Sequence, residues 1–385
     1  MRASQISAAL VAALIGHGST IALVLSAATA VAATAVGAMA EQTASWVFAV
    51  CIAKALGSAW LSWRTRVPVV LAWSTPGAAL IAATTGVTMA EAVGAFLLSA
   101  ALVVLTGLIR PLGRAVAAIP DGIAAGMLAG VLLPFCLKLG PSAAARPALV
   151  LPMLAVYLVM RLFKPGLAVL SALATGVALA FATGTTPALV AIWPDPVFIP
   201  PAFRAQVLIG LGLPLYLVTM ASQNLPGFAT LRAHGYDAPV RPALVVTGAL
   251  SGLSALFGAH PISMAAITAA LCMGPDTHPD HRQRWRTGLA YGGVWLLLGL
   301  FGPLILSTLA ALPAPLVTAI VGLALLGPLT GAATGAFAAP AQRFPAAVTL
   351  SVTASGVAVF GIGAAFWGLV AGLAVYALDR AATRP

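Results

Sequence analysis

Charged side chains are scarce along this 385-residue sequence. Only 7% of its residues are Asp, Glu, Lys or Arg, and just eight are acidic. The charged residues occur in short clusters between long apolar stretches, and the mean hydropathy is +1.05. No stretch is polar enough to cover the surface of a water-soluble domain. The sequence therefore predicts an all-α integral membrane protein without a separate soluble domain.

Cysteine is also scarce. The three cysteines, Cys51, Cys136 and Cys272, stand apart from one another within apolar segments. Isolated cysteines in such segments favour inert packing over a disulfide framework or a metal site. We therefore expect no bound metal and no other cofactor.

Hydrophobic segments fill most of the chain. A helix that crosses a bilayer needs about 20 apolar residues. Hydropathy predicts fourteen spans, several of them short: 6–31, 43–61, 67–85, 90–109, 119–137, 148–163, 166–182, 205–230, 241–254, 256–273, 287–310, 313–331, 344–360 and 362–378. The third and the tenth of these spans are short and are interrupted by proline or glycine.

The distribution of basic residues supports this count and sets the orientation. With the N-terminus in the cytoplasm, cytoplasmic segments hold fifteen of the 19 lysines and arginines, and the opposite side holds three. This asymmetry follows the positive-inside rule. One miscounted span would reverse the side of every later segment and remove the asymmetry. We expect a multi-pass protein of a bacterial-type inner membrane, surrounded by lipid, with both termini cytoplasmic. The net charge of +11 then reflects topology and implies no nucleic-acid partner.

An internal repeat indicates two inverted halves. Residues 119–133 (IPDGIAAGMLAGVLL) align with 312–326 (LPAPLVTAIVGLALL), with one proline in register. These segments are spans five and twelve, and the interrupted spans three and ten are also seven apart. An odd number of spans per repeat gives the halves opposite orientations, and paired interrupted segments in such halves point to a transporter's binding site. The alternative is a chance likeness between alanine-rich helices.

The first interrupted span predicts a helix that starts inside the membrane. Its β-branched residues around Pro68 favour an extended chain. Ser74 or Thr75 is a suitable N-cap, and Pro76 suits the first helical turn. We expect a half-helix from Pro76 to about Thr85.

The second interrupted span repeats this design in the opposite direction. Its sequence, FGAHPISMAAITAALCMG, predicts a break at Gly258–Pro261 and then a half-helix to about Met273. Two half-helices would point their N-terminal N–H groups at one position and bind an anion there. The alternative is a pair of ordinary kinked helices. The candidate substrate-binding residues at the two breaks are Ser74, Thr75, Pro76, Gly77, His260, Pro261 and Ile262.

Span eight adds two amides to this candidate site. In its sequence TMASQN, Gln223 shares a helical face with Thr219, and Asn224 shares one with Met220. An amide inside a membrane needs a hydrogen-bond partner. The partner is either the substrate or a neighbouring helix. We include Gln223 and Asn224 among the candidate substrate-binding residues.

Few ionisable residues fall within the spans. The acidic residues can all be placed near span ends, and Glu91 is expected to form a capping box with Thr88. Within the membrane stand His17, Lys54 and His260, and such residues are functional by default. We expect Lys54 to extend its amine to the cytoplasmic end of its helix. His260 lies at a break, whereas His17 could face the site or bond within the bundle.

Several motifs resemble one transporter family. AWSTPGAAL (72–80), LVTMASQNLPG (217–227), AAITAALC (265–272) and GPDTHPDHRQRW (274–285) are similar to the BenE-type benzoate/proton symporters. The spacing of these motifs and the closing TASG (353–356) also match, so the resemblance covers most of the chain.

The resemblance implies a fold as well as an activity. The family resembles the fourteen-span nucleobase and anion transporters, in which a core domain moves against a gate domain in an elevator-like way, often in a homodimer. Carried over, the halves of the core domain are residues 1–110 and 205–311, and those of the gate domain are residues 111–204 and 312–385.

One departure from the nucleobase members bears on the substrate. Those members carry carboxylates in spans eight and ten, where this sequence has Gln223, Asn224 and His260. A site without fixed negative charge suits an anion. The expected activity is import of benzoate or a similar aromatic carboxylate with a proton. The candidate carriers of the proton are His260 and, second, His17, because histidine titrates near neutral pH, with the substrate's own carboxylate as a third.

Two other functions remain as alternatives. The same fold could carry another small anion, or the protein could be an anion channel. An enzyme is disfavoured, because the spans offer no paired carboxylates, metal-ligand cluster or nucleophile–base pair.

Overall fold

Helices make up most of the structure. This computed structural model describes the chain except for residues 29–39, 110, 112–113, 115–117, 185–192 and 383–385. The helices of the first half are α1 (Ala3–Ala28), α2 (Ala40–Thr65), α3 (Thr75–Ala82), α4 (Met89–Leu108), α6 (Asp121–Leu137), α7 (Leu139–Ala145), α8 (Pro147–Phe163) and α9 (Ala168–Ala182). Those of the second half are α10 (Ala205–Val207), α11 (Leu213–Thr219), α12 (Leu225–Ala233), α13 (Val240–Ala255), α14 (Ile267–Met273), α15 (Trp285–Leu300), α16 (Gly302–Ala310), α17 (Ala314–Ala338), α18 (Arg343–Ala354) and α19 (Ala364–Ala382).

Shorter elements join these helices. Two π-helical turns, η2 (Leu208–Gly212) and η3 (Met220–Asn224), link α10, α11 and α12 into one stretch. Three 3-10 turns are η1 (Pro165–Leu167), η4 (His281–Gln283) and η5 (Pro340–Gln342). Two strands, β1 (Leu71–Trp73) and β2 (Ile262–Met264), interrupt the third and the tenth predicted spans.

The lengths of the helices identify a multi-span membrane protein. Within the described residues, eight helical stretches are long and apolar enough to cross a membrane, or nine if the bent pair α15–α16 counts as one. The helices α8 and α13 are apolar but shorter. The count of fourteen spans therefore stays a proposal.

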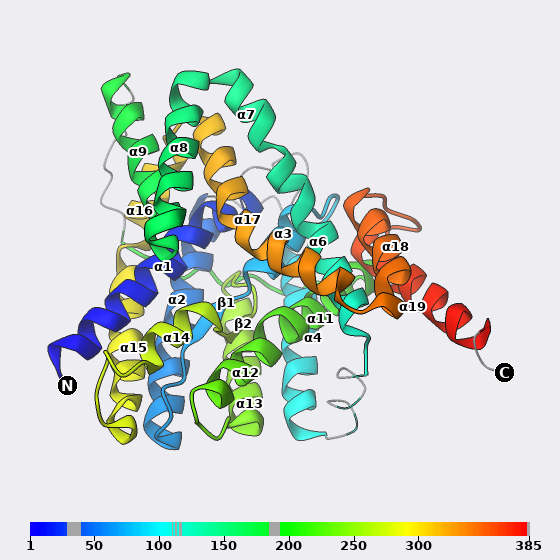
Figure 1. Ribbon diagram of the computed structural model, residues 1–385, viewed down its shortest axis with the longest axis horizontal. Helices are drawn as coiled ribbons and strands as arrows, with labels where there is room; N and C mark the ends of the chain where they lie inside the picture. The colour runs from blue at the N-terminus through cyan, green and yellow to red at the C-terminus, as the bar shows by residue number, and fades with distance from the viewer. Residues whose placement is uncertain (29–39, 110, 112–113, 115–117, 185–192, 383–385) are drawn as a thin grey trace.

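The two strands pair antiparallel in the middle of the bundle (Figure 1), with Leu71 opposite Met264 and Trp73 opposite Ile262. An extended chain after Pro68 was predicted, but its pairing with a second strand was not. The prediction of an all-α membrane protein holds at the level of fold class, and these six residues form a small local sheet within it. Their pairing satisfies backbone groups that neither interrupted helix can satisfy.

Side chains from the surrounding helices bond the outer edges of this small sheet. The hydroxyl of Ser58, on α2, accepts a hydrogen bond from the N–H of Leu71 at 3.1 Å. The hydroxyl of Ser251, on α13, accepts one from the N–H of Ile262 at 3.0 Å. Tyr291, on α15, donates to the carbonyl of Leu71 at 3.0 Å. Buried backbone groups thus find partners despite the break in the helices.

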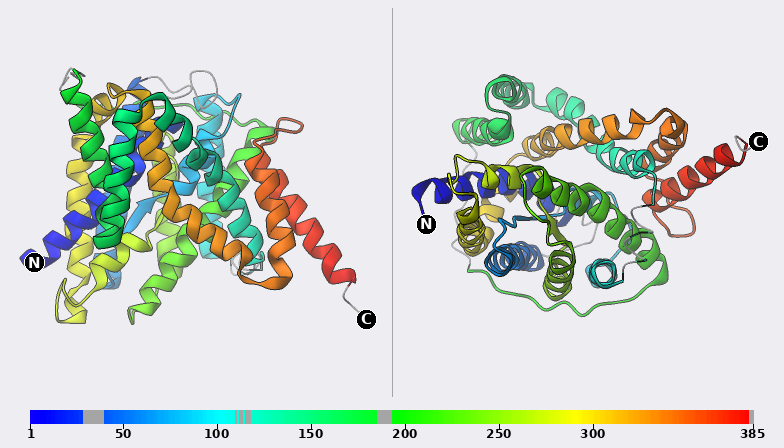
Figure 2. Two further views of the ribbon diagram at one scale, coloured as in Figure 1. Left: turned by 45° about the horizontal axis from the view of Figure 1, so that its top comes forward. Right: turned by 60° about the horizontal axis from the view of Figure 1, so that its bottom comes forward.

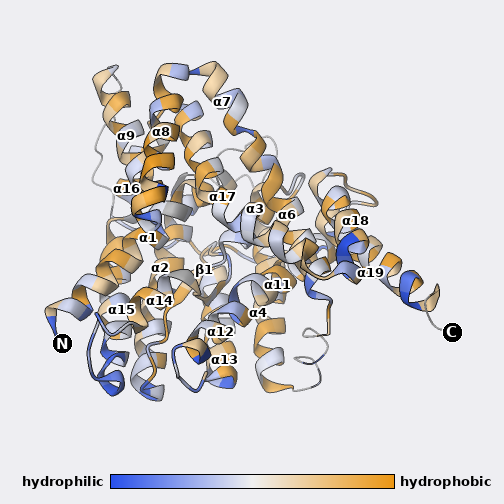
Figure 3. Cartoon of the chain, in the orientation of Figure 1, coloured by the Kyte–Doolittle hydropathy of each residue, from blue (hydrophilic) through white to orange (hydrophobic). Residues whose placement is uncertain are grey.

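The helices form two groups. In the right view of Figure 2, α6, α7, α8, α17 and α18 lie on one side of the molecule, and α2, α4, α13 and α15 lie on the other. Helix pairs pack within these groups: α2 with α15, α4 with α13, α6 with α17, α8 with α9, and α18 with α19. Figure 3 shows hydrophilic residues gathered at the lower ends of α2, α13 and α15, while apolar residues cover most of the helical lengths.

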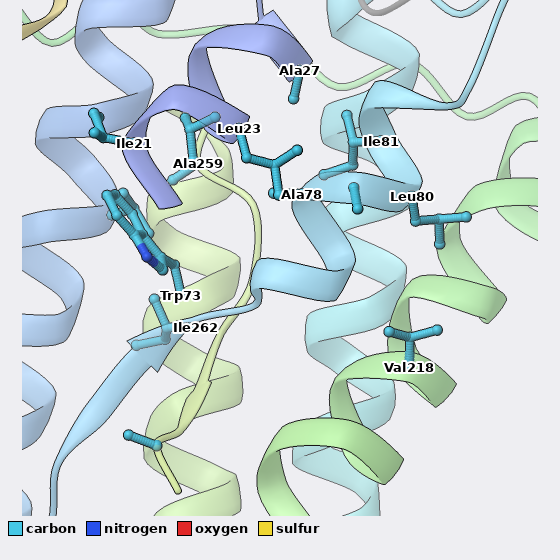
Figure 4. Packing of buried hydrophobic residues seen from close by; sticks show 14 of the residues in the cluster. Ile21, Leu23, Ala27, Trp73, Ala78, Leu80, Ile81, Val218, Ala259 and Ile262 are labelled. Carbon is cyan, nitrogen blue, oxygen red and sulfur yellow. The ribbon is translucent and has the colours of Figure 1, made fainter. Parts of the chain in front are cut away.

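Helix α3 occupies the centre of the packed interior. It lies between α1, which carries Leu23, and α11, which carries Val218, as Figure 4 shows. Nearby, Thr88 and Glu91 form the predicted capping box at the start of α4, which confirms that prediction. The Glu91 carboxylate also pairs with Arg204 at 3.0 Å.

Candidate functional site

The first break has the predicted cap. The hydroxyl of Ser74 accepts a hydrogen bond from the N–H of Gly77 at 3.2 Å, and Pro76 lies in the first turn of α3. This arrangement satisfies one of the free N–H groups at the helix start. The helix ends at Ala82, three residues before the predicted end at Thr85.

The second break differs from the prediction. The half-helix predicted to end near Met273 is present, but its predicted start directly after Pro261 is wrong, because residues Ile262–Met264 pair with β1 as a strand. Helix α14 begins only at Ile267 and has seven residues, without a capping side chain at Ala266. His260 and Pro261 therefore precede a strand. The predicted pair of matched helix N-termini reduces to one capped half-helix, α3.

Hydroxyl groups tie the start of α3 to its neighbours. Ser74 Oγ lies 2.9 Å from the hydroxyl of Thr219 on α11, and both side chains are buried. Thr75 Oγ1 lies 3.0 Å from the hydroxyl of Thr20 on α1. The first turn of α3 is thus held between α1 and α11.

Gly77 serves packing as well as the turn. A Cβ atom built on it would lie 2.7 Å from both Leu215 Cδ1 and Ser74 Oγ. Glycine therefore permits close approach of α11 to α3. This contact gives Gly77 a structural reason to be glycine, whereas the sequence suggested approach of the substrate.

The two amides of span eight lie in the π-helical turn η3. Asn224 is fully buried, and its Oδ1 accepts a hydrogen bond from the backbone N–H of Met264 at 2.9 Å. Asn224 thereby holds strand β2. Gln223 is only half-buried and stays a candidate for contact with a substrate. Turns of this type often occur at functional sites.

A cluster of basic and aromatic side chains surrounds Trp73 of β1. This basic–aromatic cluster consists of His17, Lys54, Trp73, His260 and Trp295. The ring of His17 stacks on Trp73 at 5.5 Å between centroids and contacts Trp295 at 5.6 Å. The ring of His260 stacks on Trp73 at 6.4 Å. Five segments far apart in the sequence therefore meet here.

Lys54 does not extend to the membrane surface, so that prediction is wrong. Its side chain is 0% exposed because α15 packs along α2 and covers it. The amine Nζ lies over the rings of Trp73 and Trp295, at 3.6 and 3.0 Å from the two centroids. The sequence around Lys54 does not indicate that α15 packs over its side chain.

All side-chain nitrogens of the cluster except Nδ1 of His260 lack hydrogen-bond partners among the described residues. Both ring nitrogens of His17, Nζ of Lys54, Nε2 of His260 and the indole nitrogens of Trp73 and Trp295 make no hydrogen bond there. Burying one unpaired ion costs several kcal/mol, and a desolvated cation–π contact returns only about 2 kcal/mol. The cluster thus buries several nitrogens that neither a hydrogen bond nor an acidic side chain of the described residues satisfies.

His260 has one fixed partner. Trp46 donates from its indole nitrogen to Nδ1 of His260 at 2.7 Å. Indole is a donor only, so Nδ1 carries no proton and Nε2–H is left as a free donor. Trp46 and Trp295 were not predicted as site residues, and Trp73 was expected either to pack on a substrate ring or to fill the core. Their signal was tryptophan in apolar segments, which core packing explains equally well.

A separate cavity of about 330 Å³ lies between the two groups of helices, at the C-terminal end of α3. Its walls come from α3, α6, η2 and the segment around Gly361, and Lys138 stands on its wall. Within the described residues, no three His, Cys, Asp or Glu side chains are close enough to hold a metal ion.

Solved structures similar to this fold include anion transporters. The chain aligns with the transmembrane domain of the cyanobacterial bicarbonate transporter BicA at a TM-score of 0.60 and 14% identity, covering 96% of this chain and 97% of that one. It aligns with the murine Slc26a9 anion transporter at a TM-score of 0.63 and 13% identity, covering 98% and 68%. Identities this low show a shared fold.

Sequence comparison identifies the family. Two relatives are the inner membrane protein YdcO of Escherichia coli, 40% identical over 96% of this chain and 94% of that protein, and a benzoate membrane transport protein of Acinetobacter baylyi, 37% identical over 87% and 86%. The family model for the benzoate membrane transport protein BenE matches residues 1–378. The chain therefore belongs to the BenE family, which consists of membrane transporters and not enzymes.

Proposed function

We propose that the protein imports benzoate or a similar aromatic carboxylate together with a proton. The observation that carries this proposal is the basic–aromatic cluster, which offers unpartnered donors and aromatic faces but no carboxylate. All eight acidic residues lie at helix ends or in loops, away from the cluster. A site with this chemistry favours an aromatic anion over a cation or a neutral base.

The substrate site extends from the start of α3 to the cluster. His17 and Thr20 are three residues apart on one face of α1, and Thr20 bonds Thr75 beside the N-terminus of α3. The helix dipole and free N–H groups there favour a carboxylate. Trp73 precedes the cap residue Ser74 directly and supplies an aromatic face for a ring.

The other candidate residues have different roles in this proposal. His260 donates from Nε2 to the carboxylate, and Gln223 contacts the substrate from η3. Pro76, Pro261 and Ile262 shape the backbone at the breaks. Gly77 and Asn224 act mainly through packing and the hold on β2.

Packing between helices supports fourteen spans in two inverted repeats. In such a repeat, each span corresponds to the span seven later in the chain. Helix α2 then corresponds to α13, and α4 to α15, so the packed pair α2–α15 corresponds to the packed pair α13–α4. In the same way, the pair α8–α9 corresponds to α18–α19. The central pair α6–α17 maps onto itself. The serines that bond the strands follow the same correspondence, because Ser58 comes from α2 and Ser251 from α13.

The same packing supports a core domain that moves against a gate domain. The core comprises residues 1–110 and 205–311 and holds the candidate site. The gate comprises residues 111–204 and 312–385. The 330 Å³ cavity lies where α3 of the core meets α6 of the gate, as an entry route to an elevator-like carrier requires.

The membrane location follows from charge and from the relatives. YdcO is named an inner membrane protein, and we assign this chain to the bacterial inner membrane with both termini cytoplasmic. A homodimer suits this architecture and would leave the site within each protomer.

Counterflow in proteoliposomes tests the substrate and separates the alternatives. Vesicles loaded with unlabelled benzoate should take up labelled benzoate faster than protein-free vesicles, and bicarbonate inside should not replace benzoate. Exchange only with bicarbonate or chloride would favour another small anion as the substrate. Unitary currents without counterflow would establish a channel.

A further inference from the structure

Lys54 lacks a counter-ion within the part of the chain that the structure describes. Its amine is 0% exposed, and among the described residues no acidic side chain lies within ion-pair distance of it. A lone ammonium in such a place is strongly disfavoured, and the two tryptophan rings offset only part of its lost hydration. We infer that the amine is neutral in the empty site.

The elements packed around Lys54 carry few other titratable side chains. Helices α13 and α16 pack against α2, and their described residues carry no titratable side chain except Arg241 at the membrane end of α13. The titratable groups near Lys54 and its tryptophans are His17 on α1, Cys51 on α2, Tyr291 on α15 and His260 before β2.

A bound carboxylate changes this balance. It supplies the negative charge that the cluster lacks, so that an ammonium at Lys54 forms an ion pair in a place of low dielectric. Conversely, a carboxylate beside a neutral amine would itself be an unpaired buried ion. Proton and anion therefore stabilise each other, and neither enters favourably alone.

We propose that Lys54 is the group that takes up the transported proton when an aromatic carboxylate binds. This inference rests on the proposed function. On the outer side a solvent proton bonds to the lone pair of Nζ as the carboxylate arrives. On the cytoplasmic side the N–H bond breaks, the proton leaves with the carboxylate, and the neutral amine returns. Each cycle moves one proton and one anion without net charge.

The histidines are less suited to this task. Protonation of His260 at Nδ1 would break its hydrogen bond with Trp46. His17 makes no described hydrogen bond, but its ring contacts the same two tryptophan rings as Lys54, so a proton on either group disfavours one on the other. The geometry assigns the proton to Lys54 and a donor role to His260.

Proton uptake on binding tests the assignment directly. Purified protein in a weakly buffered, slightly alkaline solution is titrated with labelled benzoate, while a pH indicator reports protons taken up per molecule bound. Wild type should take up about one proton per benzoate. Lys54→Arg, which keeps a permanent charge, should bind benzoate and take up none. Lys164→Arg makes the same change at an exposed lysine and should behave as wild type.

Three results would overturn the assignment. Uptake by Lys54→Arg equal to that of wild type would place the proton on His17 or His260. Binding by wild type without proton uptake would mean that Lys54 is already charged in the empty site. Absence of benzoate binding by wild type would refute the proposed function itself, and the assignment with it.

A second variant covers the case in which arginine does not fit. Lys54→Met is close in volume and has no charge. The empty variant should unfold at the same temperature as wild type or higher, because it replaces a neutral buried amine. Its affinity for benzoate should fall by about 10- to 100-fold, the loss expected for a charge-assisted bond. A lowered unfolding temperature of the empty variant would instead indicate a structural cation held by Trp73 and Trp295.

Discussion

Trp46 holds His260 in one tautomer. The indole nitrogen donates to Nδ1 across 2.7 Å, so the ring proton of His260 lies on Nε2. The sequence suggested His260 as the proton carrier because it lies at a break. The bond from Trp46 makes it a fixed hydrogen-bond donor within a buried cluster.

His260→Gln should therefore weaken benzoate binding without abolishing its coupling to protons. We expect a loss of about 1 kcal/mol, the usual size of one hydrogen bond. Equilibrium binding and gradient-driven uptake would be measured on the same preparation. Wild-type affinity combined with lost gradient-driven accumulation would restore His260 as the carrier.

The two neighbouring amides should give opposite results. Asn224→Ala leaves the buried N–H of Met264 without an acceptor and should destabilise the protein by about 1–3 kcal/mol. Gln223→Ala should leave stability within about 0.5 kcal/mol and weaken benzoate binding by about 1–2 kcal/mol. Thermal unfolding and binding distinguish the two. Equal stability of both variants would mean that Asn224 does not hold β2.

Gly77→Ala should destabilise the protein by about 1–3 kcal/mol, because the added methyl group overlaps Leu215 and Ser74. Gly140→Ala, at the second residue of α7, is the matched control, since no atom lies within 4 Å of the added Cβ. That change should be neutral or slightly stabilising. If Gly77→Ala unfolds like wild type but loses benzoate binding, the glycine faces the substrate instead.

Local signals were sufficient for much of the fold. The cap at Ser74, the Thr88–Glu91 capping box and the break after Pro68 each depend on a few adjacent residues, and the structure has all three. Hydropathy likewise located the long helices, because membrane-crossing length is a property of a continuous segment.

Features that depend on distant segments were missed. The helix after Pro261 was expected too early because residues 262–264 pair with a strand some 190 positions away. Lys54 was expected at the surface because nothing near it in the sequence shows that α15 covers it. The binding chemistry of the cluster likewise arises only from tertiary contacts.

Gradient-driven accumulation tests the account most directly. Proteoliposomes with an inward proton gradient, and with the membrane potential held at zero, are compared with protein-free liposomes, since benzoic acid also crosses lipid unaided. We predict that the protein accelerates accumulation of labelled benzoate, that the excess disappears when the gradient is dissipated, and that a potential alone produces none. Uptake equal to that of protein-free liposomes, or uptake driven by potential alone, would contradict electroneutral import of benzoate with a proton.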